Sequence, residues 1–374
     1  MTNTRLDTLR HRLTAPLPGD GEGQRIDGLL VSNDQNRRYV SGFTGSSGYL
    51  LVTAEQALLL TDFRYIEQAT AQAPDFSVVK IEARPAPAIA EQVKALGLRC
   101  FGFESEDVTI AAHQRLLEAL HETAPDAQAV PATGMVEALR EVKDGRERDL
   151  LRRAVEVGDR AFEHVAARLK PGMTERQVAW QLETHMREHG AERVSFDIIV
   201  AAGPHGAMPH HRPTDRPIQS GEPIVIDMGC RLNGYCSDLT RTITLGEADA
   251  KFWEIYWIVL RAQQTCEDGL RAGMLGKDAD ALARGVIEAA GHGEQFGHGT
   301  GHGVGLEVHE GPLVSKTRGE APLPEGSVVT VEPGIYLPGW GGVRIEDMVV
   351  VGQARCQVLT TAHKNPVVNV GGSP

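Results

Sequence analysis

Two apolar, β-rich runs that each carry an aspartate meet at the dipeptide Asn233-Gly234. An Asn-Gly dipeptide in this setting is the strongest short-range signal for a hairpin. The pairing implied by such a turn places Asp238 opposite Gly229, and Asp227 two residues further along the same face. Diagonal neighbours on one face lie about 7–8 Å apart, so the two carboxylates can share a ligand. They would repel each other without positive charge between them, which indicates a metal ion; the alternative is that each aspartate only marks a strand end.

Three histidines, His298, His302 and His309, lie in the glycine-rich segment 296–310. The glycines disfavour a continuous helix, so His298 and His302 are not expected to form an ordinary i, i+4 pair. Glycine also lets backbone and ligands approach closely, which suits imidazoles around a small site. A single histidine is more often a surface or core residue, but three within 12 positions favour a functional role.

Two further acidic residues stand in unusual settings. An apolar run at 328–331 ends at Glu332, where Pro333 stops the strand, and Arg344 and Glu346 are predicted to share one strand face. Taken alone, the Arg344–Glu346 pair is best explained as a salt bridge. Taken with the hairpin and the histidines, the chain offers four carboxylates and one imidazole. That set favours hard divalent ions such as Mn²⁺, with Co²⁺, Fe²⁺ or Zn²⁺ as alternatives, and it suits two ions about 3.5–4 Å apart.

Acidic side chains outnumber basic ones by 50 to 38, so the formal charge is −12. That balance argues against broad binding to nucleic-acid phosphates, which needs clustered Lys and Arg. The longest strongly apolar run, 252–260, is too short to cross a bilayer, and the N-terminus lacks the apolar core of a signal peptide. Five scattered cysteines without a C-x-x-C pair are typical of reduced thiols in a cytosol. We therefore expect a cytoplasmic protein that binds neither nucleic acid nor membrane.

The length of 374 residues suggests two domains. Residues 24–130 alternate strand-like and helix-like runs, which predicts a compact α/β unit. Its predicted strands span 26–31, 49–53, 57–61 and 77–81, and its predicted helices span 65–72, 88–96 and 110–123. The stretch 124–134, punctuated by Pro and Gly, then predicts a boundary between domains at 1–131 and 132–374.

The second domain is predicted to be α+β, with hairpins rather than a doubly wound sheet. An amphipathic helix fits 141–169, and another opens at Thr174, whose T-x-x-Q pattern with Gln177 resembles a capping box. Further helices fit 248–272 and 277–290. Strands are predicted at 195–201, 223–229, 235–245, 327–332, 343–351 and 357–361.

Five short motifs of the second domain resemble, in order and local context, the metal ligands of the pita-bread dinuclear metallopeptidases. That group includes methionine aminopeptidase, aminopeptidase P and prolidase. The matching residues are Asp227 in I-D-M-G, Asp238 in S-D-L-T-R-T, His302 in G-T-G-H-G-V-G, Glu332 in V-E-P-G and Glu346 in R-I-E-D. The preceding residues look like the creatinase-type N-domain of Xaa-Pro peptidases, notably in S-G-F-T-G-S at 41–46 and L-T-D-F-R-Y at 60–65. The resemblance, over about 135–361 and this N-domain, implies an α+β chain in which a creatinase-like α/β domain precedes a pita-bread catalytic domain.

The family's other functional residues are carried over one by one. His210, in Ala207-Met-Pro-His210, resembles the histidine that contacts the scissile bond or the leaving group, with the adjacent His211 as the competing assignment. His309 resembles the histidine that stabilises the tetrahedral intermediate, and His298 the supporting histidine before the ligand. Arg344 resembles the arginine that braces the bridging carboxylates. Such outer groups commonly matter nearly as much as the ligands themselves.

The resemblance implies hydrolysis of the peptide bond between an N-terminal residue and proline, with two divalent ions as cofactors. In the family pattern Asp227, Asp238 and Glu346 serve one ion, and Asp238, His302, Glu332 and Glu346 serve the other. Water activated between the ions attacks the carbonyl, and Glu332 moves its proton. The family pattern also implies a homodimer.

Within the Xaa-Pro class the residues leave two alternatives open. Some prolidases, which cleave dipeptides only, carry an arginine four residues after the V-H-E histidine, and here that position is Leu313. Arg37 or Arg38 is a candidate replacement for the missing charge. The short N-domain and the H-G-x-G-L-E-V-H-E run favour prolidase over aminopeptidase P, which acts on longer peptides. A non-catalytic pita-bread interaction module is disfavoured because all five ligand positions are present, and methionine aminopeptidase is disfavoured by the N-domain.

Overall fold

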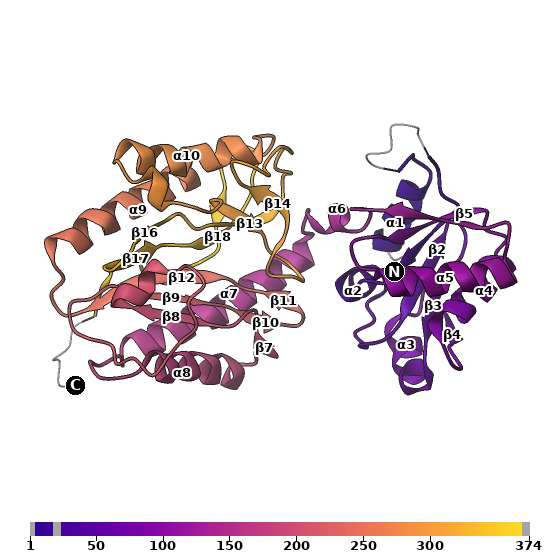
Figure 1. Ribbon diagram of the computed structural model, residues 1–374, viewed down its shortest axis with the longest axis horizontal. Helices are drawn as coiled ribbons and strands as arrows, with labels where there is room; N and C mark the ends of the chain where they lie inside the picture. The colour runs from indigo at the N-terminus through magenta and orange to yellow at the C-terminus, as the bar shows by residue number, and fades with distance from the viewer. Residues whose placement is uncertain (1–3, 18–23, 369–374) are drawn as a thin grey trace. The chain divides into compact units, whose positions relative to one another are not determined.

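The computed structural model describes residues 4–17 and 24–368. The chain divides into two compact units, 1–140 and 141–374, and each is described by itself (Figure 1). The domain boundary predicted after residue 131 lies inside the last strand of the first unit and stays a prediction.

The first unit is an α/β layer built on a mixed sheet with the strand order β4-β3-β2-β1-β5-β6 among its described residues. The strands are β1 (Gly28–Val31), β2 (Tyr49–Thr53), β3 (Ala57–Thr61), β4 (Ser77–Lys80), β5 (Cys100–Glu104) and β6 (Gln128–Ala132). The helices are α1 (Thr4–Leu13), α2 (Asp34–Ser41), α3 (Ile66–Gln72), α4 (Pro85–Ala95), α5 (Ile110–Thr123) and α6 (Glu137–Arg140), with a 3₁₀ turn, η1, at Phe63–Tyr65. The predicted α/β unit is confirmed, with β2, β3 and α5 at the predicted bounds.

The glycine-rich segment 42–48 that follows α2 is a loop. Gly42 ends the helix with a φ of 79°, a left-handed conformation that glycine adopts without strain. Arg37 is buried beneath this loop and donates to the carbonyl oxygens of Gly45 at 2.6 Å and Gly48 at 2.9 Å. Its guanidinium therefore holds the loop of its own unit together, which removes it as a candidate for binding a substrate charge.

The second unit is a mixed α+β structure, as predicted. Its helices are α7 (Gly145–Ala166), α8 (Glu175–Glu188), α9 (Ala250–Gly269) and α10 (Gly276–Ala289), with 3₁₀ turns η2 (Gly203–Ala207) and η3 (Gly293–Gln295). Its strands are β7 (Arg193–Val194), β8 (Ile199–Ala202), β9 (Ile224–Met228), β10 (Cys230–Leu232), β11 (Tyr235–Cys236), β12 (Leu239–Leu245), β13 (Gly301–Gly303), β14 (Glu310–Val314), β15 (Val328–Val331), β16 (Gly334–Leu337), β17 (Gly341–Arg344), β18 (Asp347–Val350), β19 (Gln357–Val358) and β20 (Val367–Val368).

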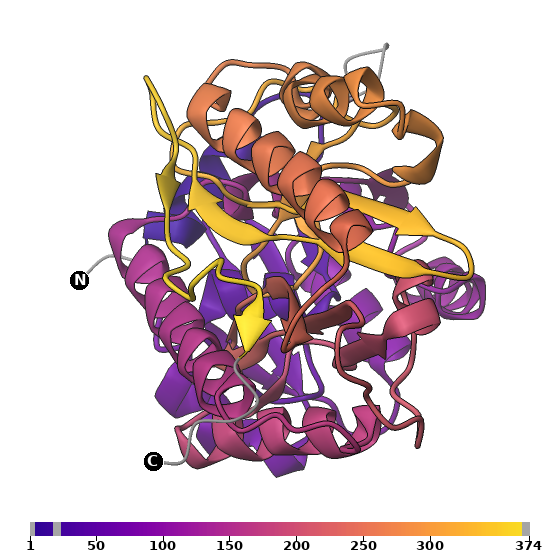
Figure 2. The ribbon, with the colours of Figure 1, turned by 90° about the vertical axis from the view of Figure 1, so that its left-hand side faces the viewer.

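These elements form two halves, each a helix pair packed on a sheet (Figures 1 and 2). In the first half α7 and α8 cover the sheet that runs β20-β12-β9-β8. In the second half α9 and α10 cover β16 and β17 and the sheet that runs β14-β13-β15-β18-β19. Each half has its own apolar core, in which the helix pair packs against the strands of that half.

Helix α8 begins where the sequence predicts it. The Thr174 side chain accepts a hydrogen bond from the Gln177 backbone N–H at 3.2 Å, and the Gln177 side chain accepts one from the Thr174 N–H at 2.9 Å. This reciprocal capping box is the predicted one. It fixes the position of Glu175, the first residue of the helix.

The predicted hairpin is confirmed in its turn and in its register. Asn233 and Gly234 have φ angles of 49° and 85°, as a two-residue turn with positive φ at both positions requires. Pairing continues from the turn to Leu239 opposite Met228 and Thr240 opposite Asp227. The strand predicted at 235–245 is interrupted before β12, and the strand predicted at 343–351 is interrupted between β17 and β18.

None of the helices in the described part of the chain combines the length and the apolar character needed to cross a membrane. All five cysteines fall among the described residues and are free thiols, three of them buried.

Candidate metal centre

The five predicted ligands come from strands or strand ends of both halves of the second unit. Asp227 lies in β9, Asp238 immediately precedes β12, His302 lies in β13, Glu332 immediately follows β15, and Glu346 lies between β17 and β18. The two strand interruptions thus coincide with Asp238 and Glu346. Because a break in a strand frees the side chain from strict alternation, both carboxylates can turn toward the middle of the unit.

The five side chains line one pocket of about 1370 Å³. The Nε2 atom of His302 lies 3.3 Å from an oxygen of Glu332 and 3.7 Å from an oxygen of Asp238. Ligand atoms of Asp238, His302 and Glu346 all lie within 4.8 Å of one another. These are the distances at which oxygen and nitrogen atoms can share one or two ions.

Several buried carboxylates lie close together in this cluster, an arrangement that a cation would stabilise. Burial, and then the neighbouring carboxylates, raise the pKa values of Asp238 and Glu346 well above the ordinary range. One oxygen of Asp227, Oδ1, is buried with no hydrogen-bond partner among the described residues. An orphaned buried carboxylate oxygen is rare in folded proteins. A divalent ion would satisfy this oxygen and offset the crowded negative charge, so the residues fit the metal that the motifs imply.

His302 presents the correct nitrogen for a ligand. Its Nδ1 lies 3.1 Å from the Gly303 carbonyl oxygen, which can only accept, so Nδ1 carries a proton and Nε2 points to the carboxylates. Burial lowers the pKa of His302, but the hydrogen bond to Glu332 raises it by more, so the pKa lies above its ordinary value. The same contact lowers the pKa of Glu332 to about 2 despite its burial.

Arg344 is paired with Asp227, and the simple Arg344–Glu346 salt bridge considered from the sequence is not what the described residues form. Its guanidinium donates to Asp227 Oδ2 at 2.6 Å, to the Tyr336 hydroxyl at 2.8 Å and to Thr240 Oγ1 at 3.1 Å. Glu346 instead accepts a hydrogen bond from Thr240 Oγ1 at 2.7 Å. Because the chain breaks its strand after Arg344, strict alternation does not hold across these positions.

His298 contacts Arg344 indirectly, through the Tyr336 hydroxyl. Its Nδ1 lies 2.8 Å from the Gly299 carbonyl oxygen, and its Nε2 lies 2.8 Å from the Tyr336 hydroxyl. Burial lowers the pKa of His298 and raises that of Tyr336 to about 12, so Tyr336 donates to a neutral imidazole while it accepts from Arg344. Sequence reasoning missed Tyr336 and Thr240. Thr240 stands inside the S-D-L-T-R-T motif, two residues after Asp238, and Tyr336 lies two residues beyond the V-E-P-G motif, so nearness to these motifs is the signal that could have found them.

His309 and His210 both line the pocket. The His309 ring lies 4.3 Å from that of His302, measured between ring centroids. Partial burial, and then the charge of His302, lower the pKa of His309, with His210 and Arg318 adding to the effect. A neutral imidazole with one N–H is therefore available at the pocket wall.

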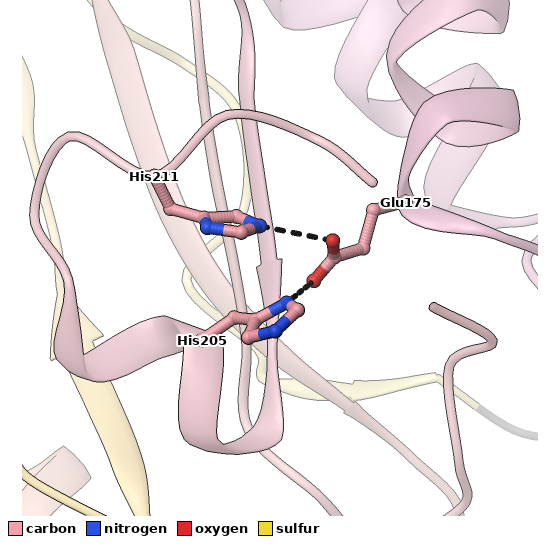
Figure 3. Close-up of side chains that lie close together, drawn as sticks. All are labelled: Glu175, His205 and His211. Carbon is pink, nitrogen blue, oxygen red and sulfur yellow. Dashed lines mark hydrogen bonds and ion pairs between the residues drawn. The ribbon is translucent and has the colours of Figure 1, made fainter. Parts of the chain in front are cut away.

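The competing residues His210 and His211 both line the pocket but differ in their burial and contacts. His210 is exposed in the pocket, whereas His211 is buried and its Nε2 lies 2.9 Å from a carboxylate oxygen of Glu175 (Figure 3). The geometry therefore favours His210 as the residue that meets a substrate.

This fold and this donor set define a dinuclear-type metallopeptidase, and comparison with known proteins gives the same class. Metallopeptidase family M24 matches residues 149–353, and the Creatinase/Prolidase N-terminal domain matches residues 20–142. The chain belongs to metallopeptidase family M24 and is an enzyme. The predicted family and the predicted architecture, a creatinase-like domain followed by a pita-bread domain, are confirmed.

Several relatives extend over nearly the whole chain. A Xaa-Pro dipeptidase of Pyrococcus horikoshii is 36% identical over 341 residues, 91% of this chain and 94% of that protein. The solved structure of a Xaa-Pro dipeptidase from Bacillus anthracis is 41% identical, with a TM-score of 0.92 over 98% of this chain and 99% of that one. The structure of an X-Pro aminopeptidase from Thermotoga maritima is 39% identical, with a TM-score of 0.85 over 92% and 98%.

Proposed function

We propose that this metallopeptidase hydrolyses the peptide bond that precedes proline in Xaa-Pro dipeptides. The observation that carries the proposal is that four carboxylates and His302 line one pocket. The relatives that match nearly the whole chain include Xaa-Pro dipeptidases. The preferred ion is Mn²⁺, with Co²⁺ or Zn²⁺ as alternatives, because oxygen ligands predominate. The enzyme acts in the cytoplasm, as its scattered cysteines suggest, and it is a homodimer, as the family pattern implies.

Each side chain of the pocket has a proposed task. Asp227, Asp238 and Glu346 would hold one ion, and Asp238, His302, Glu332 and Glu346 would hold the other. When bound, the two ions would bring the pKa of water toward neutrality and polarise the scissile carbonyl. Glu332 accepts the proton of the attacking water and passes it to the proline nitrogen as the C–N bond breaks. His309, held neutral, donates its N–H to the developing oxyanion, and His210 contacts the leaving proline.

Arg318 supplies the reason to favour dipeptides. Leu313 leaves the usual position of a carboxylate-binding arginine apolar, but Arg318 lines the same pocket and lies close enough to His309 to lower its pKa. A dipeptide bound with its scissile carbonyl at His309 carries its free carboxylate only a few bonds away. Arg318 therefore binds that carboxylate, as arginine does well through two parallel N–H donors.

A panel of peptides tests the proposal. Rates on Xaa-Pro, Xaa-Pro-Yaa and Xaa-Pro-amide substrates are measured with Mn²⁺, Co²⁺ and Zn²⁺. We expect the free dipeptide to be the best substrate, and Arg318→Gln to raise KM for the dipeptide while leaving KM for the amide nearly unchanged. Tripeptides cleaved as fast as dipeptides would instead establish the aminopeptidase P alternative. The similarity to the X-Pro aminopeptidase of Thermotoga maritima, at 39% identity, is the reason to test it.

A further inference from the structure

A buried carboxylate outside the metal centre holds the loop that carries His210. Glu175 is fully buried at the first position of α8. One of its oxygens, Oε1, accepts from the Ala202 backbone N–H at 2.9 Å, and the other, Oε2, accepts from the Thr214 N–H at 3.0 Å and the Thr214 hydroxyl at 2.8 Å. The carboxylate therefore joins the start of α8 to the end of β8 and to the far end of the loop 203–214.

Two histidines of that loop complete the arrangement (Figure 3). His205 Nδ1 lies 2.9 Å from Oε1 of Glu175, and His211 Nε2 lies 2.9 Å from Oε2. Burial raises the pKa of Glu175, but the surrounding N–H donors lower it below its ordinary value, so the group is an ionised acceptor. An ionised carboxylate only accepts, and both histidine nitrogens must therefore donate.

The same three side chains are of the types that bind divalent metals, and atoms of all three lie within 4.8 Å of one another. Their hydrogen bonding argues for a different role. Both Glu175 oxygens already accept from backbone or hydroxyl donors, and none of the three side chains has a buried atom without a partner in the described residues. Asp227 at the metal centre has such an orphaned oxygen. The Glu175 cluster is complete without an ion.

The cluster is linked to the pocket because His211 and His210 are adjacent in the chain. Both His210 and His211 line the pocket, but His211 is buried against Glu175 whereas His210 is exposed. The His211 N–H also donates to the Met208 carbonyl oxygen at 3.1 Å, which closes a tight turn over His210. Holding the His211 ring and backbone therefore fixes the backbone position from which the His210 side chain extends.

We propose that Glu175, acting through His211, is a positioning residue that orients His210 toward the leaving proline. The inference rests on the role of His210 in the proposed function. A misplacement of about 1 Å at a reacting group can cost about 100-fold in rate. Loss of the His211 hydrogen bond is therefore expected to lower kcat by a factor of about 10–100, with little change in KM.

A double-mutant cycle tests the path. His211→Leu removes the donor, His211→Gln keeps an N–H donor near the Nε2 position, and His210→Ala removes the positioned side chain. We expect His211→Leu to slow turnover, His211→Gln to restore most of it, and His211→Leu to have little further effect in the His210→Ala background. Effects that act through one group are not additive, whereas independent effects add.

His205→Leu is the matched control because it removes an equally short hydrogen bond to the other oxygen of Glu175, five residues before His210. We expect it to lower kcat much less than His211→Leu does. Melting temperature and bound metal are measured for each variant, and a His211→Leu protein that melts and loads metal like the parent isolates the positioning effect.

The outcomes separate the two proposals. A parent protein inactive on Xaa-Pro dipeptides overturns the proposed function and this inference together. An active parent that is slowed by His210→Ala but not by His211→Leu overturns the inference alone, as do fully additive effects or a His205→Leu variant that is equally slow. A third equivalent of Zn²⁺ bound by the parent and lost in His211→Leu would show that the cluster is a metal site instead.

Discussion

Arg344 shows how much of this site depends on single side chains. Its guanidinium is buried, and its three donor directions go to Asp227, Tyr336 and Thr240. Through Thr240 it is connected to Glu346, so one cation orients ligands from both halves of the unit. A lysine carries the same charge but is a compact donor without the fork, and it cannot make all three contacts at once.

Arg344→Lys is therefore expected to keep the fold and to weaken the site. Loss of such outer contacts typically costs 10–100-fold in metal affinity or activity. We expect a decrease of about that size in the affinity for Mn²⁺, measured by isothermal titration of the metal-free protein. Arg216→Lys is the control, because Arg216 forms its ion pair with Glu222 away from the pocket. Equal effects of the two substitutions would contradict a specific role for Arg344.

Motifs in the sequence pick out five candidate ligands that lie around one pocket, but they do not predict all of the contacts of these residues. Each ligand stands in a short motif that can be recognised locally, and the structure brings all five into one pocket. The partner of Arg344 could not be predicted from alternation, because alternation assumes an unbroken strand and this strand breaks at 345–346. The choice between His210 and His211 depended on Glu175, which is 35 residues away from His210 in the chain. No local pattern reports such a long-range contact.

At the scale of elements, the hairpin at Asn233-Gly234 places Asp227 and Asp238 on neighbouring strands. Its register was predictable because the turn type fixes the pairing. Helix α2 was not predicted, for a physical reason. Its buried residues include Asn36, Arg37 and Ser41, so the buried face is largely polar and hydrophobic periodicity cannot reveal it.

Gly229→Ala is expected to disrupt the hairpin and with it the metal site. A Cβ atom at Gly229 would overlap the Ser237 carbonyl oxygen, which is backbone and cannot yield cheaply. The two strands would separate where Asp238 leaves the ladder. We expect loss of bound Mn²⁺, measured by elemental analysis, and turnover reduced at least about 100-fold. Gly285→Ala is the matched control, because that glycine lies in α10 with open space around it. A Gly229→Ala protein with full metal content would disprove the close approach.

At the scale of the whole molecule, the two units depend on different conditions. The metal ligands all belong to the unit 141–374, whereas the first unit contains Glu104, a buried carboxylate. Bound divalent ions would cancel up to four of the twelve negative formal charges of the chain. The stability of the second unit should follow metal concentration, and that of the first should follow pH.

Glu104 gives the sign of the pH dependence. Burial, opposed by the backbone N–H groups of Asn33 and Ser32, raises its pKa from 4.5 to about 7. Between these values the folded state binds more protons than the unfolded state, so stability falls as pH rises toward 7 and levels off above it. We expect thermal unfolding of the first unit to show this decrease, of the order of 3 kcal/mol. Glu104→Gln should flatten it, while the exposed Glu118→Gln should leave the slope intact; an unchanged slope in Glu104→Gln would contradict the assignment.

Metal binding should act on the second unit alone. An ion at 100 times its dissociation constant stabilises the state that binds it by about 2.7 kcal/mol, which slows exchange through unfolding about 100-fold. On addition of Mn²⁺, hydrogen exchange measured by mass spectrometry should therefore slow in peptides from β9, β13 and β18, which contain or adjoin ligands. Peptides from β1, β2 and β3 should exchange at the same rate with and without the ion. Asp238→Asn should remove the protection, because it deletes a carboxylate that the proposed function assigns to both ions. Equal slowing in both units would show that they unfold as one, and no slowing in either would reject the metal centre itself.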